Sequence, residues 1–205
     1  RFERQEISPW RTYKSKTAKY AKLKNVDDYV VTVAPIQLED VILVTYNGYA
    51  LRFSINDVPV VGSKAAGVKA MNLKDSDHIV SAFIANTTSL YLLTHRGSLK
   101  RMAIDVIPTT SRANRGLQVL RELKSKPHRV FKAGPVYLED SSFEFDLFSS
   151  VSNHEGDTFV LEIMSKTGKV YDVDLSQWSF SERTSNGSFV SDKISDEEVF
   201  SVKIK

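Results

Sequence analysis

The stretch HRGSLKRMAIDVIPTTSRANRGLQVLREL, residues 95–123, decides the fold, because an earlier stretch of the chain repeats it in register. That earlier stretch is YNGYALRFSINDVPVVGSKAAGVKAMNL, residues 46–73. The coincident positions, each 49 residues apart, are Gly48 and Gly97, Arg52 and Arg101, Pro59 and Pro108, and Gly67 and Gly116. Four coincidences at one offset indicate an internal repeat, and a period near 50 is typical of propeller and array architectures.

A third copy lies further along the chain. Gly168 and Gly187 each follow Gly97 and Gly116 by 71 residues, so the last unit carries an insertion. The first residues resemble the end of an earlier unit. We therefore expect one domain over 1–205 that is a fragment of a longer polypeptide, with the end of a blade at 1–37, blades at 38–86 and 87–135, and a last blade with an acidic insertion at 136–205.

Each unit predicts short strands and an all-β fold. The apolar run VILVTY, residues 41–46, leads into Asn47-Gly48, a pair typical of two-residue type I′ hairpin turns, and then into a second strand at 49–53. Further strands are expected at 28–34, 78–84, 117–124, 129–133, 158–164 and 198–204. About four strands per unit favour a propeller-like arrangement of blades, which leaves only short sheet edges.

Composition excludes several classes of function. The 205 residues contain no cysteine, so disulfides and thiolate metal sites are absent, and no apolar run is long enough to span a membrane. The four histidines lack metal-ligand spacing, and no catalytic motif occurs. GSKAAGVK, residues 62–69, departs from the phosphate-binding loop pattern after its second glycine. We expect no catalytic residue, no metal and no cofactor.

The charge is unevenly distributed along the chain. With 28 Lys and Arg against 25 Asp and Glu, the net charge is only +3. By unit, the net charge is +4 for 1–37, −1 for 38–86, +8 for 87–135 and −8 for 136–205. A blade edge lined with Arg and Lys suits phosphate contacts, which give affinity without reading sequence. A solvated edge that is kept basic to prevent aggregation is the alternative interpretation.

The charge alone leaves both interpretations open, and the one that we develop takes double-stranded DNA as the partner. The candidate phosphate contacts are, in order of preference, Arg96, Lys100, Arg101, Arg112, Arg115 and Arg121, then Arg11, Lys14, Lys16, Lys19 and Lys22, then Arg52, Lys64 and Lys69.

The two stretches quoted above resemble blades of the C-terminal domain of the A subunit of bacterial type IIA topoisomerases. RGSLKR, SRANRGLQVLREL and KPHRV carry the resemblance most specifically, and they are closest to the topoisomerase IV branch. The resemblance implies a β-pinwheel, in which neighbouring blades exchange strands and a basic rim binds and bends DNA. It also implies a separate catalytic core in the same subunit, with an ATPase B subunit in an A2B2 holoenzyme active in decatenation and supercoil relaxation, and a cytoplasmic, nucleoid-associated location.

One departure from the family matters. Gyrase A subunits carry a box of the pattern QRRGGKG for tight wrapping, and this chain has only partial counterparts at 62–67, 111–116 and 183–187. We therefore expect bending of DNA without full wrapping. A propeller-like scaffold for protein partners is the alternative function, and a propeller enzyme that acts on small molecules is a second alternative.

Overall fold

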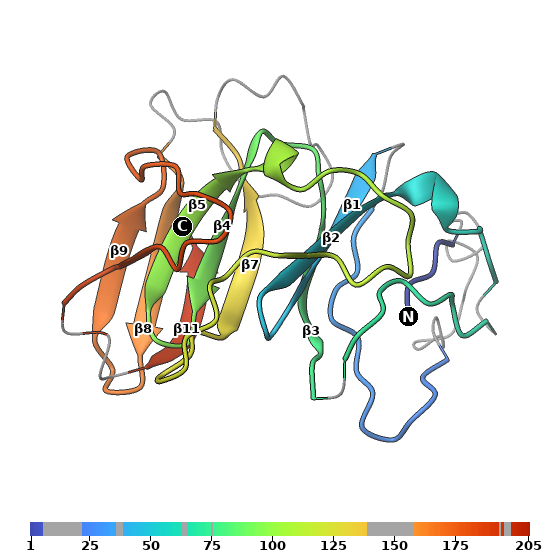
Figure 1. Ribbon diagram of the computed structural model, residues 1–205, viewed down its shortest axis with the longest axis horizontal. Coiled ribbons are helices and arrows are strands. Elements are labelled where there is room, and N and C mark those ends of the chain that lie inside the picture. Colours follow the sequence, from blue (N-terminus) through green and yellow to red (C-terminus); the bar gives the residue numbers. More distant parts are fainter. Residues whose placement is uncertain are drawn as a thin grey trace, which may run out of the picture.

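The computed structural model describes residues 1–5, 22–35, 39–62, 65–74, 76–138, 158–192, 194 and 198–205. Three antiparallel sheets lie side by side, with the sheet that contains β1 on the right of Figure 1 and the sheet that contains β8 on the left. In this part of the chain, no helix has the length and apolar character needed to cross a membrane. The predicted all-β, propeller-like fold is confirmed.

Each sheet is built around a hairpin. The first has the order β3-β1-β2-β6, the second β10-β5-β4-β7, and the third β11-β8-β9. The strands are β1 Asp40–Thr45, β2 Tyr49–Ser54, β3 Ile79–Ile84, β4 Ser89–Thr94, β5 Ser98–Ala103, β6 Leu117–Gln118, β7 Val130–Val136, β8 Val160–Ser165, β9 Val170–Asp174, β10 Ser188–Phe189 and β11 Val199–Ile204. Two 3-10 turns, η2 Ile55–Asp57 and η3 Ile104–Val106, follow β2 and β5.

The hairpin turns have a different type from the one predicted. Gly48 has a φ of 81°, but Asn47 is not among the residues with positive φ, so the turn is not type I′. The amide of Gly48 donates to the carbonyl of Thr45 at 3.0 Å, and β2 begins one residue later. This is the three-residue loop in which a turn is followed by one left-handed glycine.

A hydroxyl side chain supports the same turn in all three hairpins. The amide of the residue after the glycine donates to Thr45 Oγ1 at 3.1 Å in the first hairpin, to Thr94 Oγ1 at 3.1 Å in the second and to Ser165 Oγ at 3.2 Å in the third. The repeat therefore includes a Thr or Ser three residues before each of these glycines.

Neighbouring units exchange a short strand. β6 belongs in sequence to the second hairpin's unit but pairs with β2 of the first sheet, and β10 comes from the last unit and pairs with β5. Upstream of each exchanged strand, one backbone bond recurs three times: the amides of Val61, Thr110 and Ser181 donate to the carbonyls of Arg4, Arg52 and Arg101. The exchange that characterises a pinwheel is thus present.

A glycine brings the chain into contact with the adjacent sheet at each exchange. A Cβ on Gly116 would lie 2.3 Å from the carbonyl oxygen of Ala50, and one on Gly187 would lie 2.3 Å from that of Leu99. Both glycines also have positive φ, 82° and 71°. A side chain at either position would push the exchanged strand off its partner.

Two of the three core clusters of the described residues lie between adjacent sheets. Ile42 and Val44 of β1 pack with Leu90 and Leu92 of β4, whereas the alternate β4 residue Leu93 packs toward the third sheet. Because both faces of the central sheet are covered, β4 is buried along its whole length.

Two predicted strands are corrected. Residues 28–34 form no strand, and Tyr29 and Val33 are 65% and 74% exposed. By repeat position this stretch corresponds to β3, which forms as a strand because it pairs with β1; among the described residues no hairpin pairs with 28–34. In 117–124 only Leu117–Gln118 is strand, because the chain then turns inward to bury Val119 and Leu120.

The two kinds of glycine give a matched test of strand exchange. We expect Gly116→Ala to lower the free energy of unfolding by about 3 kcal/mol or more, since it combines a left-handed backbone with a clash. Gly168→Ala is the control: Gly168 has a φ of 83° but nothing within 4 Å of a Cβ, so only the backbone cost of about 1 kcal/mol remains. Urea denaturation measures both, and equal losses would contradict the role of close approach.

Candidate nucleic-acid interface

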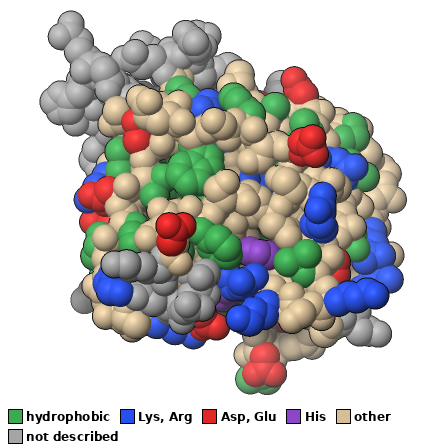
Figure 2. Space-filling model, turned by 60° about the vertical axis from the view of Figure 1, so that its left-hand side comes forward, with side chains coloured by type: hydrophobic (Ala, Val, Ile, Leu, Met, Phe, Trp, Pro, Cys, Tyr) green, Lys and Arg blue, Asp and Glu red, His purple; other side chains and the backbone are tan. Residues whose placement is uncertain are grey.

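An exposed basic segment connects β6 to β7. Arg121, Lys124, Lys126 and, within β7, Lys132 are all exposed. The one acidic residue in this segment is Glu122, whose carboxylate accepts from the guanidinium of Arg129 at 3.0 and 3.1 Å. Arg129 therefore balances Glu122, and the remaining cations face solvent. Figure 2 shows Lys and Arg side chains gathered at the lower and right-hand margins of one face.

Arg96 in the second hairpin holds this segment in place. Its Nη1 donates to the carbonyl of Lys126 at 2.9 Å and lies 3.2 Å from His128 Nε2. Its guanidinium also lies 5.5 Å from the ring centre of Phe189 in β10. Arg96 is half-buried, so it contributes positive charge beside the segment while it fixes the backbone of Lys126, which has a left-handed φ of 49°.

The geometry around His128 fixes its protonation. An arginine only donates, so His128 Nε2 must accept from Arg96, and Nδ1 carries the proton and donates to Thr94 Oγ1 at 3.2 Å. Burial, and next the charge of Arg96, lower the pKa of His128. The histidine is therefore neutral in the folded protein at pH 7.

The loop 111–116 presents a second group of cations. Arg112 donates to the carbonyls of Asp57 and Lys69, each at 3.0 Å, and so joins this loop to the unit 38–86. Its guanidinium stays partly exposed, and Lys69 is exposed beside it with its ammonium on Asn72 Oδ1. Arg115 lies over the ring of Tyr49, with the guanidinium carbon 4.2 Å from the ring centre.

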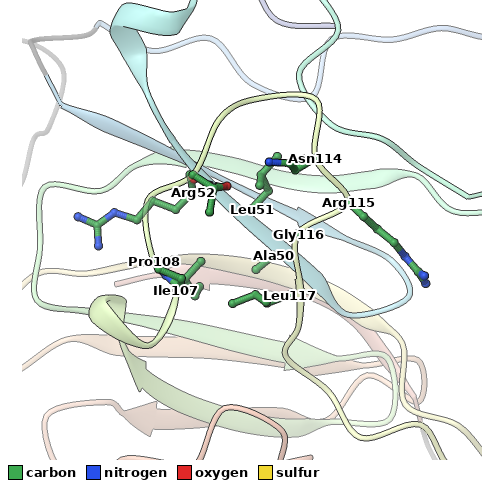
Figure 3. A pocket seen from close by; sticks show the side chains of 10 residues that line it. Ala50, Leu51, Arg52, Ile107, Pro108, Asn114, Arg115, Gly116 and Leu117 are labelled. Atoms are coloured by element: carbon green, nitrogen blue, oxygen red, sulfur yellow. Dashed lines mark hydrogen bonds between the residues drawn. The ribbon is translucent and has the colours of Figure 1, made fainter.

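A pocket lies beside this loop. Its volume is about 290 Å³, and it lies between β2 and residues 107–117. Figure 3 shows Arg52 and Arg115 at its two ends, pointing away from it in opposite directions. These two arginines therefore do not converge on the space, as the polar groups of a ligand site do. The described part of the chain also contains no group of three or more His, Asp or Glu side chains that could hold a metal ion.

Two of the preferred candidates are inside the protein, and their predicted role as phosphate contacts is corrected. Lys100 is 0% exposed and Arg101 is 8% exposed. Arg101 donates to Ser89 Oγ and to the carbonyl of Leu175, and it lies over Phe180. Burial lowers the pKa of Lys100 to about 8, with a smaller contribution from the charge of Arg183. Neither side chain can reach a DNA backbone.

The other candidates fall into three groups. Arg52 is only 20% exposed and pairs with Asp40 at 2.8 Å and Asp105 at 3.4 Å, so it is a poor phosphate ligand. Lys22 is exposed. The candidates that lie outside the described residues are Arg11, Lys14, Lys16, Lys19 and Lys64.

The choice of contacts by charge and repeat position misses three exposed cations of the unit 87–135. Lys124, Lys126 and Lys132 are absent from the predicted contacts, although all three face solvent. The signal that could have found them is the run of five basic residues against one acid between 121 and 132. Two of the preferred contacts fail because the side chains of Lys100 and Arg101 in β5 are buried.

In the last unit, two lysines pair with acids. Lys166 pairs with Glu198, and the Lys205 ammonium lies 2.6 Å from Asp172 and 3.2 Å from Glu162. The uncompensated positive charge of the described residues therefore concentrates on the unit before it.

Comparisons with known proteins agree with this architecture. A family model of the DNA gyrase C-terminal domain, a beta-propeller, matches residues 39–86 and 88–136. The A subunit of DNA topoisomerase 4 from Streptococcus pyogenes serotype M3 (strain ATCC BAA-595 / MGAS315) is 60% identical over 199 residues, which are 97% of this chain and 24% of that protein. The Streptococcus pneumoniae serotype 4 (strain ATCC BAA-334 / TIGR4) protein of the same name is 60% identical over 200 residues, 98% of this chain and 24% of that protein. The chain thus spans about a quarter of the length of these relatives.

Solved structures show the same fold. The crystal structure of the C-terminal domain of DNA topoisomerase IV matches with a TM-score of 0.78 and 34% identity, over 94% of this chain and 55% of that one. A structure of the DNA gyrase A C-terminal domain matches with a TM-score of 0.72 over 98% of this chain and 61% of that one. At 20% identity, the second match supports the fold alone.

The neutral His128 predicts an acid-sensitive fold. Its pKa in the folded protein is below the ordinary value of about 6.5, so the unfolded chain takes up a proton first as the pH falls. Its contribution to stability is present above pH 6.5 and is lost as the pH falls through the folded pKa. We expect the free energy of unfolding to fall from pH 7 to pH 5, and to fall less steeply in His128→Gln, whose amide oxygen accepts from Arg96 without titrating.

The control for this measurement is His95→Gln, because burial also lowers the pKa of His95. The double variant separates the two contributions. A pH dependence that His128→Gln leaves unchanged would show that Arg96 does not depend on this acceptor.

Proposed function

This chain belongs to the family of C-terminal β-propeller domains of type IIA topoisomerase A subunits, and we propose that it binds and bends duplex DNA through its phosphates without catalysing a reaction itself. The observation that carries the proposal is the exposed basic segment 121–132, where Arg121, Lys124, Lys126 and Lys132 face solvent.

The arrangement of the cations suits a phosphate backbone. Within this segment the one acid, Glu122, pairs with Arg129, so among the described residues of the segment the charge of the other cations is not cancelled. Sequence-independent binding needs this kind of surface, because Lys and Arg side chains release counterions from the DNA as they replace them. Arg112, Arg115 and Lys69 extend the surface from the adjacent loop, with part of each arginine committed to the protein.

The role in the whole enzyme follows from the family. We propose that the domain presents a bent duplex to the catalytic core of the same subunit, and that this supports decatenation and supercoil relaxation together with an ATPase B subunit. The partial match to the wrapping box at 111–116 favours bending over full wrapping. A cytoplasmic, nucleoid-associated location belongs to the same proposal.

The test is a salt titration of duplex binding, followed by fluorescence anisotropy. We expect the logarithm of the affinity to fall steeply with the logarithm of the salt concentration for the unaltered chain. Each phosphate contact that is removed should flatten the slope by about 0.9. Arg121→Ala/Lys124→Ala/Lys126→Ala should therefore flatten it by about 2.7, that is, three contacts at about 0.9 each.

The matched control is Lys166→Ala/Lys205→Ala, which removes two paired lysines from the last unit and should leave the slope unchanged. An unaltered chain that shows no salt-dependent binding would overturn the proposal and favour a protein scaffold. A slope that changes only in the control would move the DNA to the last unit.

A further inference from the structure

The ammonium of Lys100 sits in a cage of backbone carbonyls. The carbonyl oxygen of Val119 lies 2.9 Å from Nζ, and those of Glu182, Arg183 and Ser185 lie at 3.0, 2.8 and 3.0 Å, so the three N–H donors are shared among four acceptors. The side chain is 0% exposed, and every one of these ligands is a neutral oxygen. Four carbonyl oxygens around one buried charge are the ligands by which proteins replace the hydration shell of a monovalent cation.

Among the described residues, the cage has no counterpart where the unit 87–135 packs on the unit 38–86. The counterpart of Lys100 in the unit 38–86 is Leu51, 49 residues earlier, which is buried in an apolar core. The loop that faces Leu51 is 111–116, and there Asn114 Nδ2 donates to the carbonyl of Ser111. A cation is therefore not a requirement of the fold, and its presence at the junction between 87–135 and the last unit needs its own explanation.

The cage links the unit 87–135 to the last unit. Val119 follows β6, whereas the other three carbonyls belong to the loop 182–185, which leads directly into Gly187 and β10. Phe189 of β10 lies against both Arg96 and His128. The position of the loop 182–185 therefore affects Arg96 and His128, which hold the basic segment 121–132 in place.

We propose that these four carbonyls form a monovalent-cation site that Lys100 fills with a tethered ammonium, and that Lys100 is thereby a positioning residue for the DNA-binding surface. The second part rests on the proposed function, whereas the first does not. The distances of 2.8–3.0 Å suit ammonium and potassium better than the smaller sodium ion. Removing the side chain takes the ammonium donor from the carbonyls of Val119, Arg183 and Ser185, whereas the carbonyl of Glu182 still accepts from Ser185, and it makes room for such an ion.

The first experiment measures the melting temperature of Lys100→Ala in sodium, potassium or ammonium chloride at one concentration. We expect the variant to melt at least about 5 °C below the unaltered chain in sodium chloride. Ammonium and potassium should recover a large part of that loss in a saturable manner. The controls are the unaltered chain and Lys100→Met, whose side chain fills the space, and neither should distinguish the three salts.

Equal melting temperatures of Lys100→Ala in the three salts would overturn the cation site. If Lys100→Ala does not fold, the unaltered chain supplies the test, because the hydrogen-bonded ammonium of Lys100 should give a nitrogen NMR signal with protons that exchange slowly. Rapid exchange of these protons would also overturn the cation site.

The second experiment measures duplex binding by the same variants at matched ionic strength. Lys100→Ala should bind about tenfold more weakly in sodium chloride, and ammonium chloride should restore the affinity, which loss of a phosphate contact could not explain. Unchanged binding in sodium chloride would refute the positioning role. If the unaltered chain binds no duplex in any salt, the proposed function fails, while the melting result still decides the cation site.

Discussion

The close approach of a glycine backbone to the neighbouring sheet is the constraint on which the rest of the structure depends. Gly67, Gly116 and Gly187 each lie where a Cβ would meet a carbonyl oxygen of the preceding unit, at 2.5, 2.3 and 2.3 Å. These contacts let each unit lie directly on the sheet before it. Leu90, Leu92 and Leu93 are buried in the clusters that form between adjacent sheets.

The same constraint sorts the cations into two populations. Residues near the exchanged strands point inward, so Lys100 and Arg101 satisfy carbonyl groups and carry no exposed charge. Residues on the connection from β6 to β7 lie outside the exchange and keep their charge in water. Arg96 lies between the populations, since it touches Phe189 of an exchanged strand and the carbonyl of Lys126 in the basic segment. Arg96 thus contacts both an exchanged strand and the basic segment.

Sequence reasoning is accurate where a local signal has a single physical cause. The repeated glycines, the apolar runs and the alternation of units of opposite charge are all properties of short stretches, and they predict the hairpins, the strand positions and the basic unit. It is inaccurate where the outcome depends on a partner. Residues 28–34 have the composition of a strand but pair with no strand among the described residues, and Asn47-Gly48 forms its turn with one left-handed residue instead of two.

By itself, the sequence determined the repeat, the all-β class, the family and the unit that carries the positive charge, because periodic glycines and net charge are set by composition and spacing. Only the tertiary structure decided which cations are free. In the sequence, Lys100 and Lys124 are two lysines of the same basic unit. Strand exchange buries Lys100 among four carbonyls, whereas Lys124 is exposed. Whether a charge faces water depends on which residues pack against it. For Lys100 one of these residues is Glu182, which is 82 residues away in the sequence.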